Sequence, residues 1–416
     1  MLNNKQVLDI PVDVQVSTRR FPAWPFYNPD EIEAVKRVLL SGNVNYWTGE
    51  EGHSFEREFA AFHGVKHAVA LANGTVALEL AMHVLGIGPG DEVIVTSRTF
   101  IASASCVVLQ GATPVFADVD RNSQNITAES IREVLTPRTK AIIAVHLAGW
   151  PCDMDAIMEL AEEHHLKVIE DCAQAHGAKY KDRYVGSFGH AAAFSFCQDK
   201  IMTTGGEGGM LLTDDDDIWS SAWSYKDHGK SYDSVFHKKH PPGFHWLHDS
   251  FGTNWRMTEM QAAIGRVQLR KLSRWVDIRR RNASILTWCL SKWDAIRLPL
   301  PPAGIFHSYY KYYIFIRPEK LNPGWDRDKI MCRINEEGVP CYSGSCSEIY
   351  LEKAFSESTL AQNDRLPVAR GLGETSLMFL VHPTLSPEDM LASVSVIEKV
   401  MAEASMKNGL PRPRII

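Results

Sequence analysis

The sequence predicts an α/β protein with a mainly parallel sheet, followed by a smaller α+β domain. Between residues 67 and 213, short apolar runs alternate with helical patterns, which is the order expected of βαβ units. Neighbouring positions within each run are apolar, as in strands buried on both faces of a sheet. After residue 290 the order becomes strand, helix, strand and helix. A chain of 416 residues is long enough to form both units.

Seven apolar runs are the candidate strands of the parallel sheet. They cover residues 67–72, 92–97, 114–118, 140–147, 167–171, 191–196 and 209–213. Helical patterns connect the earlier runs, at 75–86, 99–110, 127–134 and 153–165. Helices of this length between strand-like runs indicate βαβ units, so we expect a mostly parallel sheet sandwiched by helices.

Two helices are expected before the first strand. Their patterns cover 31–41 and 52–63, and each ends at a glycine, Gly42 or Gly64, as helices commonly do. Residues 1–20 have no strong periodicity, so we expect a flexible or subunit-wrapping arm there.

Residues 215–256 separate the last strand-like run from a long helix. They are rich in Trp, His, Lys and Pro and have little periodicity, which predicts long loops with a functional or interface role. The helix is expected from about Thr258 to Leu286 and would complete a large domain over residues 21–286. Its three arginines at 279–281 are interpreted as a solvated helix face rather than a phosphate site.

A small C-terminal domain is expected over residues 287–405. Its predicted strands lie at 309–317 and 379–383, and its predicted helices at 326–337 and 387–404. The last residues, 406–416, are expected to form a disordered tail.

Composition narrows the classes of partner. The net charge of −6 argues against binding to nucleic acid or to an anionic membrane surface. No apolar run approaches the ~20 residues of a membrane helix, and the N-terminus lacks a secretory signal pattern. The eight cysteines are scattered and form no CxxC pair, so we expect reduced thiols, no structural metal and a cytoplasmic location.

One lysine stands between the last two strand-like runs. Lys200 follows the run at 191–196, and four glycines lie between 205 and 209, before the final run. Glycines let backbones approach closely, so this lysine could be held at a fixed place for chemistry. Taken alone, a solvated lysine on a surface hairpin is the favoured interpretation.

Two more positions lie where a predicted strand gives way to a helix. Gly74 and Thr75 open the helical pattern at 75–86, where backbone amides and a hydroxyl make either an anion site or a plain capped turn. Phe100 follows the next strand end, where its ring could stack on a planar ligand. An isolated aromatic residue is more often part of a core.

A carboxylate and an amide follow the run at 167–171. Asp171 and Gln174 lie at its carboxyl end, the edge at which open α/β sheets bind ligands. Asp171 could pair with a cationic ligand nitrogen, and Gln174 could hydrogen-bond a phenolic oxygen. The alternative for Asp171 is a helix cap.

Together these groups match one ligand. An anion site at 74–75, a carboxylate at Asp171, an aromatic face at Phe100, a hydroxyl at Ser195 and an amine at Lys200 suit pyridoxal 5′-phosphate (PLP). Lys200 would form the Schiff base with its aldehyde, and Asp171 would keep the ring nitrogen protonated.

The chain resembles the fold-type I, PLP-dependent sugar aminotransferases of the DegT/DnrJ/EryC1/StrS family over about residues 20–405. The matching motifs are NGTVALELA (73–81), TFIASAS (99–105), VIEDCAQAHGA (168–178), SFGHAAAFSFCQDKIMTTGGEGGM (187–210) and NWRMTEMQAAIG (254–265). The resemblance implies an aspartate-aminotransferase-like fold with a mostly parallel seven-stranded sheet.

The resemblance also implies roles at the matching positions. Lys200 matches the catalytic lysine, Asp171 the partner of the pyridine nitrogen, and Gln174 the residue near the ring hydroxyl. The remaining cofactor positions are the stacking Phe100 and the phosphate-binding Gly74, Thr75 and Ser195. Asn254 matches an asparagine that reaches the cofactor phosphate of the neighbouring subunit, which implies a homodimer with shared active sites. His228 matches a histidine near the substrate.

Three regions depart from the common family pattern. Ala148 stands where the family often has tyrosine, which would open space beside the cofactor. Tyr310 takes the place of a second histidine, and the adjacent Lys311 is a candidate substrate contact. Residues 338–350 differ too, and they are expected to shape the sugar-binding part of the site.

The resemblance implies a transaminase that moves an amino group from L-glutamate to a keto group of a nucleotide-activated deoxysugar. Its pathway would make amino sugars for surface polysaccharides or natural products. One alternative is a PLP-dependent sugar dehydratase, in which a histidine replaces the lysine. Another is an aminotransferase for a cyclitol or other non-nucleotide ketone. A third is a non-catalytic scaffold or regulator, which would usually lose the lysine or the carboxylate, whereas Lys200 and Asp171 are both present.

Overall fold

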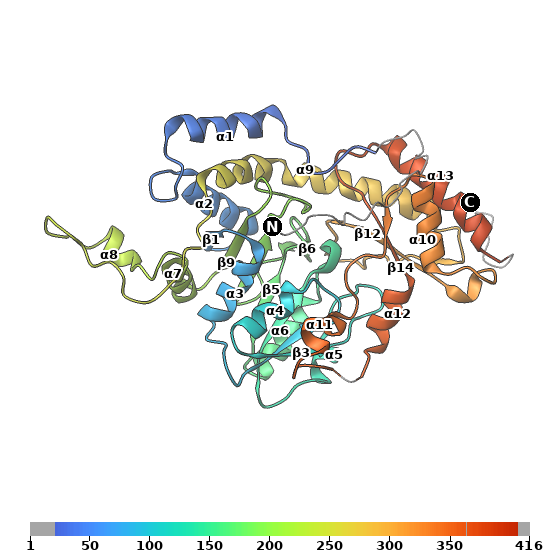
Figure 1. The fold of residues 1–416 in the computed structure, drawn as a ribbon, viewed down its shortest axis with the longest axis horizontal. Coiled ribbons are helices and arrows are strands. Elements are labelled where there is room, and N and C mark those ends of the chain that lie inside the picture. Colours follow the sequence, from blue (N-terminus) through green and yellow to red (C-terminus); the bar gives the residue numbers. More distant parts are fainter. Residues whose placement is uncertain (1–20, 363, 407–416) are drawn as a thin grey trace, which may run out of the picture.

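The computed structural model describes residues 21–362 and 364–406, arranged around one large sheet and two small ones (Figure 1). The arm predicted over 1–20 and nearly all of the tail predicted over 406–416 lie outside the described residues. No helix of the described chain is both long enough and apolar enough to cross a membrane.

The large sheet has seven strands in the order β1-β9-β8-β5-β4-β2-β3. Their bounds are β1 His67–Leu71, β2 Glu92–Thr96, β3 Thr113–Ala117, β4 Thr139–Val145, β5 Lys167–Asp171, β8 Ala191–Ser195 and β9 Gly209–Thr213. Pairing is parallel from β8 through β5, β4 and β2 to β3, and β9 runs antiparallel to both of its neighbours. The predicted mostly parallel seven-stranded sheet is therefore confirmed.

Helices cover both faces of this sheet. Those that connect successive strands are α3 Gly74–Val84, α4 Ala102–Leu109, α5 Ala128–Arg132 and α6 Met154–Glu163. Val93 and Val95 of β2 pack in the same core as α3 and α4, whereas Ile94 packs in the core of α6 on the opposite face. This alternation explains why the strands are apolar at successive positions.

A long helix joins the large sheet to the C-terminal part of the chain. Figure 1 shows α9, Glu259–Leu290, running beneath α1, Pro29–Ser41, and on toward α13, Pro387–Ala404. Helix α2, Glu51–His63, also packs against α9. A capping box of Thr258 and Gln261 starts α9 where the sequence predicts it.

The C-terminal elements form a four-stranded antiparallel sheet in the order β10-β12-β14-β13. Its strands are β10 Ile296–Arg297, β12 Tyr312–Ile316, β13 Cys341–Tyr342 and β14 Ser376–Phe379. Helices α10 Arg327–Glu336, α11 Lys353–Ser356, α12 Pro367–Thr375 and α13 accompany it. A third sheet joins β6 Lys179–Tyr180, β7 Arg183–Tyr184 and β11 Ile305–Phe306.

Three sequence predictions need correction. The strand expected at 379–383 is β14, which ends at Phe379, because its partners on both sides pair no further than that residue. The stretch 215–256 is not all loop, since it contains α7 Asp216–Tyr225 and α8 Tyr232–Phe236. Arg279 does not lie on a solvated face: its side chain is buried, and Nη1 donates to the carbonyl of Tyr310 at 3.2 Å.

Candidate active site

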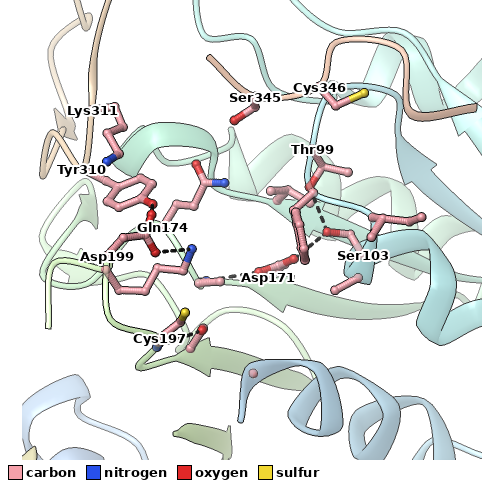
Figure 2. A pocket seen from close by; sticks show the side chains of 18 of the residues that line it. Thr99, Ser103, Asp171, Gln174, Cys197, Asp199, Tyr310, Lys311, Ser345 and Cys346 are labelled. Carbon is pink, nitrogen blue, oxygen red and sulfur yellow. Dashed lines mark hydrogen bonds and ion pairs between the residues drawn. The ribbon is translucent and has the colours of Figure 1, made fainter. Parts of the chain in front are cut away.

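A cavity of about 1230 Å³ lies between the carboxyl ends of the central strands and the C-terminal elements. Its lining includes eight predicted site residues: Gly74, Thr75, Phe100, Asp171, Gln174, Ser195, Lys200 and Lys311. Figure 2 shows Gln174, Asp171 and Asp199 facing this space, with Tyr310 and Lys311 above them. The fold thus brings together side chains from α3, β5, β8 and β12, which are far apart in the sequence.

Asp171 ends β5 and is buried. Its carboxylate accepts hydrogen bonds from the Ser103 hydroxyl at 2.7 Å and the Ala173 amide at 3.1 Å. Burial raises the pKa of Asp171 above its usual value, although these two hydrogen bonds and the charge of Lys200 act in the opposite direction. A cationic ligand beside it would favour the ionised carboxylate.

Gln174 presents one end of its amide to the protein. Its Oε1 accepts the backbone N–H of Ala148 at 2.8 Å, which leaves its NH₂ group as the donor toward the cavity. Ala148 itself does not line the cavity, so the expectation that it opens space there is wrong. Its backbone is left-handed, with φ of 57°, and its side chain is buried in a core cluster with Val119 and Tyr313.

The amino end of α3 lines the cavity and could bind an anion. The side chain of Asn73 caps Val76 at 3.0 Å, so the amides of Gly74 and Thr75 open the helix. A Cβ on Gly74 would lie 2.6 Å from the Cβ of Ser195, which shows how closely the hydroxyl approaches the helix end. Amides at a helix N-terminus together with adjacent hydroxyls suit a phosphate.

The glycines after Lys200 do not line the cavity, although their position beside the lysine suggested that they would. Of residues 205–209, only Glu207 lines the cavity. A Cβ on Gly209 would meet the carbonyl oxygen of Asn73 at 2.2 Å, and one on Gly208 would meet Oγ1 of Thr204 at 2.0 Å. The missing side chain of Gly209 therefore lets β9 pass close to the start of α3, whereas Gly208 makes room for the Thr204 side chain.

Lys200 lies beside an acid that sequence reasoning did not single out. Its Nζ is 3.4 Å from Oδ1 of Asp199, and Oδ2 of Asp199 accepts the hydroxyl of Tyr310. Nζ also lies 5.1 Å from the centre of the Tyr310 ring. Burial opposes ionisation of Asp199, yet Lys200 and the Tyr310 hydroxyl together hold its pKa below the usual value. Asp199 directly precedes Lys200 in the sequence, and this adjacency could have identified it as a site residue.

The cavity also contains residues to which the sequence assigned no individual role. The indole N–H of Trp24 donates to the carbonyl of Lys200 at 2.8 Å, which ties the segment before α1 to the lysine. Ser103, which holds Asp171, also hydrogen-bonds Thr99 at 2.8 Å. The C-terminal elements add Tyr313, Tyr342, Ser345, Cys346 and Met378.

Phe100 lines the cavity at its open edge. Its relative exposure is 66%, so the alternative that it belongs to the core is wrong. His228 and Asn254 are exposed and do not line the cavity of their own chain. They lie close together at the base of the α8 segment, where Asp227 and Asn254 form an isolated bridge.

The chain is similar to known aminotransferases in both sequence and structure. The model of the DegT/DnrJ/EryC1/StrS aminotransferase family matches residues 26–400. The UDP-N-acetyl-3-dehydro-α-D-glucosamine 3-aminotransferase of Acidithiobacillus ferrooxidans is 38% identical over 379 residues, covering 89% of this chain and 94% of the relative. The GDP-perosamine synthase of Escherichia coli O157:H7 is 34% identical over 370 residues, covering 88% and 95%. The crystal structure of an aminotransferase from Psychrobacter cryohalolentis is 56% identical, with a TM-score of 0.91 over 92% of this chain and 99% of that one.

Proposed function

This chain belongs to the DegT/DnrJ/EryC1/StrS aminotransferase family and is therefore an aminotransferase, and we propose that it uses PLP to move an amino group from L-glutamate to a keto group of a nucleotide-linked sugar. Two relatives are named for UDP- and GDP-linked sugars, which supports this class of acceptor. The donor would become a 2-oxo acid and the acceptor an amino sugar for polysaccharide or natural-product synthesis in the cytoplasm.

The observation that carries the proposal is a lysine and a buried carboxylate in one cavity. Asp171 has no ion-pair partner in the described part of the chain, although it is buried. A protonated ring nitrogen would provide that partner. At the end of β8 and the start of α3, Gly74, Thr75 and Ser195 offer amides and hydroxyls for a phosphate. These residues fit both charged ends of PLP.

When bound, PLP supplies an aldehyde carbon that receives the amino group and a pyridinium ring that stabilises negative charge on the carbon being deprotonated. Lys200 offers the amine that would hold the aldehyde, and its Nζ beside Asp199 is placed to take up and return a proton. Asp171 would keep the ring nitrogen protonated, and the NH₂ of Gln174 would donate to the ring hydroxyl. Phe100 would cover one face of the ring.

The dimensions of the cavity favour a large acceptor. At about 1230 Å³, the cavity exceeds the ~300–1,000 Å³ that is usual for a small-ligand site, so it has room for a cofactor and a second ligand. Residues Tyr342, Ser345 and Cys346, from the segment predicted to shape the sugar site, line it. A sugar joined to a nucleotide would make use of this added volume.

We also propose a homodimer with shared active sites. Asn254 is exposed and lies away from the cavity of its own chain, as expected if it reaches the cofactor phosphate of a second copy. His228 is placed similarly and would lie near the substrate in the second copy.

The test combines cofactor analysis with a substrate panel. We expect the purified protein to be yellow, and borohydride followed by peptide mass analysis should locate PLP on Lys200. Keto sugars linked to UDP, GDP or dTDP, incubated with ¹⁵N-labelled glutamate, should yield at least one labelled amino sugar. A protein that cannot bind PLP would refute the cofactor. Amination of a cyclic ketone but of no nucleotide sugar would refute the acceptor class.

A further inference from the structure

One side of the cavity carries more positive than negative charge. Lys311 lines the cavity, with its Nζ 4.6 Å from the centre of the Tyr310 ring. No carboxylate in the described chain forms an ion pair with it. Burial, followed by the charges of Arg279 and Lys200, lowers the pKa of Lys311 to about 8 despite the opposing effect of Asp199. A partly buried ammonium group without a counter-ion is destabilising unless a ligand provides one.

Arg279 adds a second cation whose charge acts on this lysine. Its side chain is buried, and Nη1 donates to the carbonyls of Tyr309 at 3.5 Å and Tyr310 at 3.2 Å. Its Nε and Nη2 have no hydrogen-bond partner among the described residues, and its Cζ lies 5.2 Å from the ring of Trp24. Arg279 thus strengthens the positive potential at Lys311 with no acid bound to it.

Among the described residues, Asp199 is the acid whose charge acts on both Lys311 and Arg279, and it is already engaged by the Tyr310 hydroxyl and by Lys200. His382 also faces this side, stacked on Trp24, and burial lowers its pKa to about 3, so its ring is neutral near pH 7. The side formed by Tyr310, Lys311 and Arg279 is therefore suited to an anion.

The position relative to Lys200 indicates which anion. Lys200 and Lys311 both place Nζ near the ring of Tyr310, so an anion held at Lys311 lies on the side where the amine reacts. The α-carboxylate of an amino acid is attached to the same carbon as its amino group. The diphosphate of a nucleotide sugar is instead separated from the keto carbon by the sugar ring. The cofactor phosphate has its own place at Gly74 and Thr75, at the start of α3.

We propose that Lys311, supported by Arg279, binds a carboxylate of the amino donor. This inference rests on the proposed function and deepens it, because it assigns the donor site within the cavity. The ammonium group of Lys311 would form a charge-assisted hydrogen bond with the carboxylate. Arg279 would not touch the donor; its charge would add to the positive potential that attracts the carboxylate. With its carboxylate at Lys311, the donor would direct its amino group toward Lys200.

The experiment measures equilibrium binding to PLP-loaded enzyme by calorimetry. Glutarate carries the two carboxylates of glutamate without its amine, and UDP carries a diphosphate without a sugar. For Lys311→Met we expect glutarate to bind about 10- to 100-fold more weakly, as for the loss of a hydrogen bond between charged groups, with UDP binding changed less than about twofold. Lys311→Arg should retain most of the glutarate affinity. Lys36→Met, at an exposed position on α1, is the matched control.

Each result has a defined meaning. Weaker glutarate binding in Lys311→Met with unchanged UDP binding, and recovery in Lys311→Arg, would support the donor site. Weaker UDP binding with unchanged glutarate binding would overturn it in favour of the nucleotide diphosphate, and no change in either would also overturn it. Wild-type enzyme assayed in parallel separates the two proposals: if it carries PLP and aminates a sugar, only the role of Lys311 is in question. A wild type without PLP would refute both. Circular dichroism of each variant excludes misfolding.

Discussion

Asp171 shows at the residue scale how burial prepares a carboxylate for one cation. Its raised pKa reflects the cost of holding a charge without a counter-ion, and Ser103 and Ala173 limit that cost through hydrogen bonds. The chain therefore maintains an arrangement that is unfavourable on its own and favourable with a cationic ligand.

Asp171→Asn should bind PLP but transaminate poorly. The amide has similar shape but cannot favour a protonated ring nitrogen, and a neighbouring opposite charge typically shifts a pKa by about 1–3 units, so turnover should fall about 10- to 1,000-fold. The measurement is single-turnover absorbance with glutamate. Ser103→Ala keeps the carboxylate and should lose less; an equal loss in both variants would contradict the charge argument.

The charge of Lys311 should lower the stability of the folded protein, although the same charge would bind the amino donor. Its pKa is about 8 in the folded chain and 10.5 in the reference state, so between these pH values the unfolded chain binds more protons and stability rises with pH. Below pH 8 the folded protein bears the full cost of this partly buried charge. Lys311→Met should therefore raise the free energy of unfolding by about 1–3 kcal/mol at pH 7 and flatten its rise above pH 8. Chemical denaturation of the cofactor-free protein at pH 7, 9 and 10 measures both. A destabilised variant would indicate that Lys311 is not costly.

At the scale of elements, the active site depends on close contact between β9 and the start of α3. Gly209 pairs with Leu71 on one side and Ser195 on the other, and its missing side chain leaves room for the carbonyl of Asn73. The helix end that would bind phosphate is thus held by a strand that carries no ligand-binding group of its own.

Gly209→Ala should disturb both stability and cofactor binding. The added Cβ would lie 2.2 Å from the Asn73 oxygen, so the backbone must shift at a cost of about 1–3 kcal/mol, and PLP should bind more weakly. Gly371→Ala in α12 is the control, because its Cβ would meet nothing within 4 Å. That variant should be neutral or up to about 1 kcal/mol more stable. Thermal unfolding measures the stability of the two variants, and fluorescence titration measures their affinity for PLP. Equal melting temperatures for Gly209→Ala and Gly371→Ala would contradict the close contact between Gly209 and Asn73.

At the scale of the whole molecule, the most exposed aromatic residues lie on the segment around α8. Figure 1 shows this segment projecting away from the rest of the chain. Phe244, Trp246 and Phe251 have relative exposures of 76%, 84% and 99%. Apolar surface of this kind is typical of an interface, and Asn254 and His228 lie at its base. A second copy of the chain would bury it in the proposed dimer.

Mixing two inactive variants tests whether the sites are shared. Lys200→Ala and Asn254→Ala should each be impaired, but in a mixed dimer one site combines Lys200 of one copy with Asn254 of the other. After equal mixing and exchange, about a quarter of the sites should be restored, because half of the dimers are mixed and each has one intact site. Activity of the exchanged mixture measures this. Sites contained within one chain would instead give only half the activity of Asn254→Ala.

Local patterns in the sequence determined much of the fold and part of the site. The positions of the strands along the chain and the mostly parallel class of the sheet follow from apolar runs and helical spacing, which depend on near neighbours in the chain. Lys200, Asp171 and the amino end of α3 lie at strand ends or turns, so their motifs indicate where they fall on the sheet. The stretch that contains α7 is predicted as loop, although Trp219 and Trp223 stand four residues apart and so share one face of the helix.

Only the tertiary structure decided which distant residues complete the site. The hydrogen bond from Tyr310 to Asp199 joins positions 111 apart, and no local pattern relates them. Arg279 resembled a solvated residue because the sequence does not indicate that Trp24 and the carbonyls of residues 309 and 310 cover it. The charge on each side of the cavity is a sum over such non-local neighbours. The periodic elements could thus be read from the chain itself, whereas the electrostatics at Lys311 depend on how those elements pack.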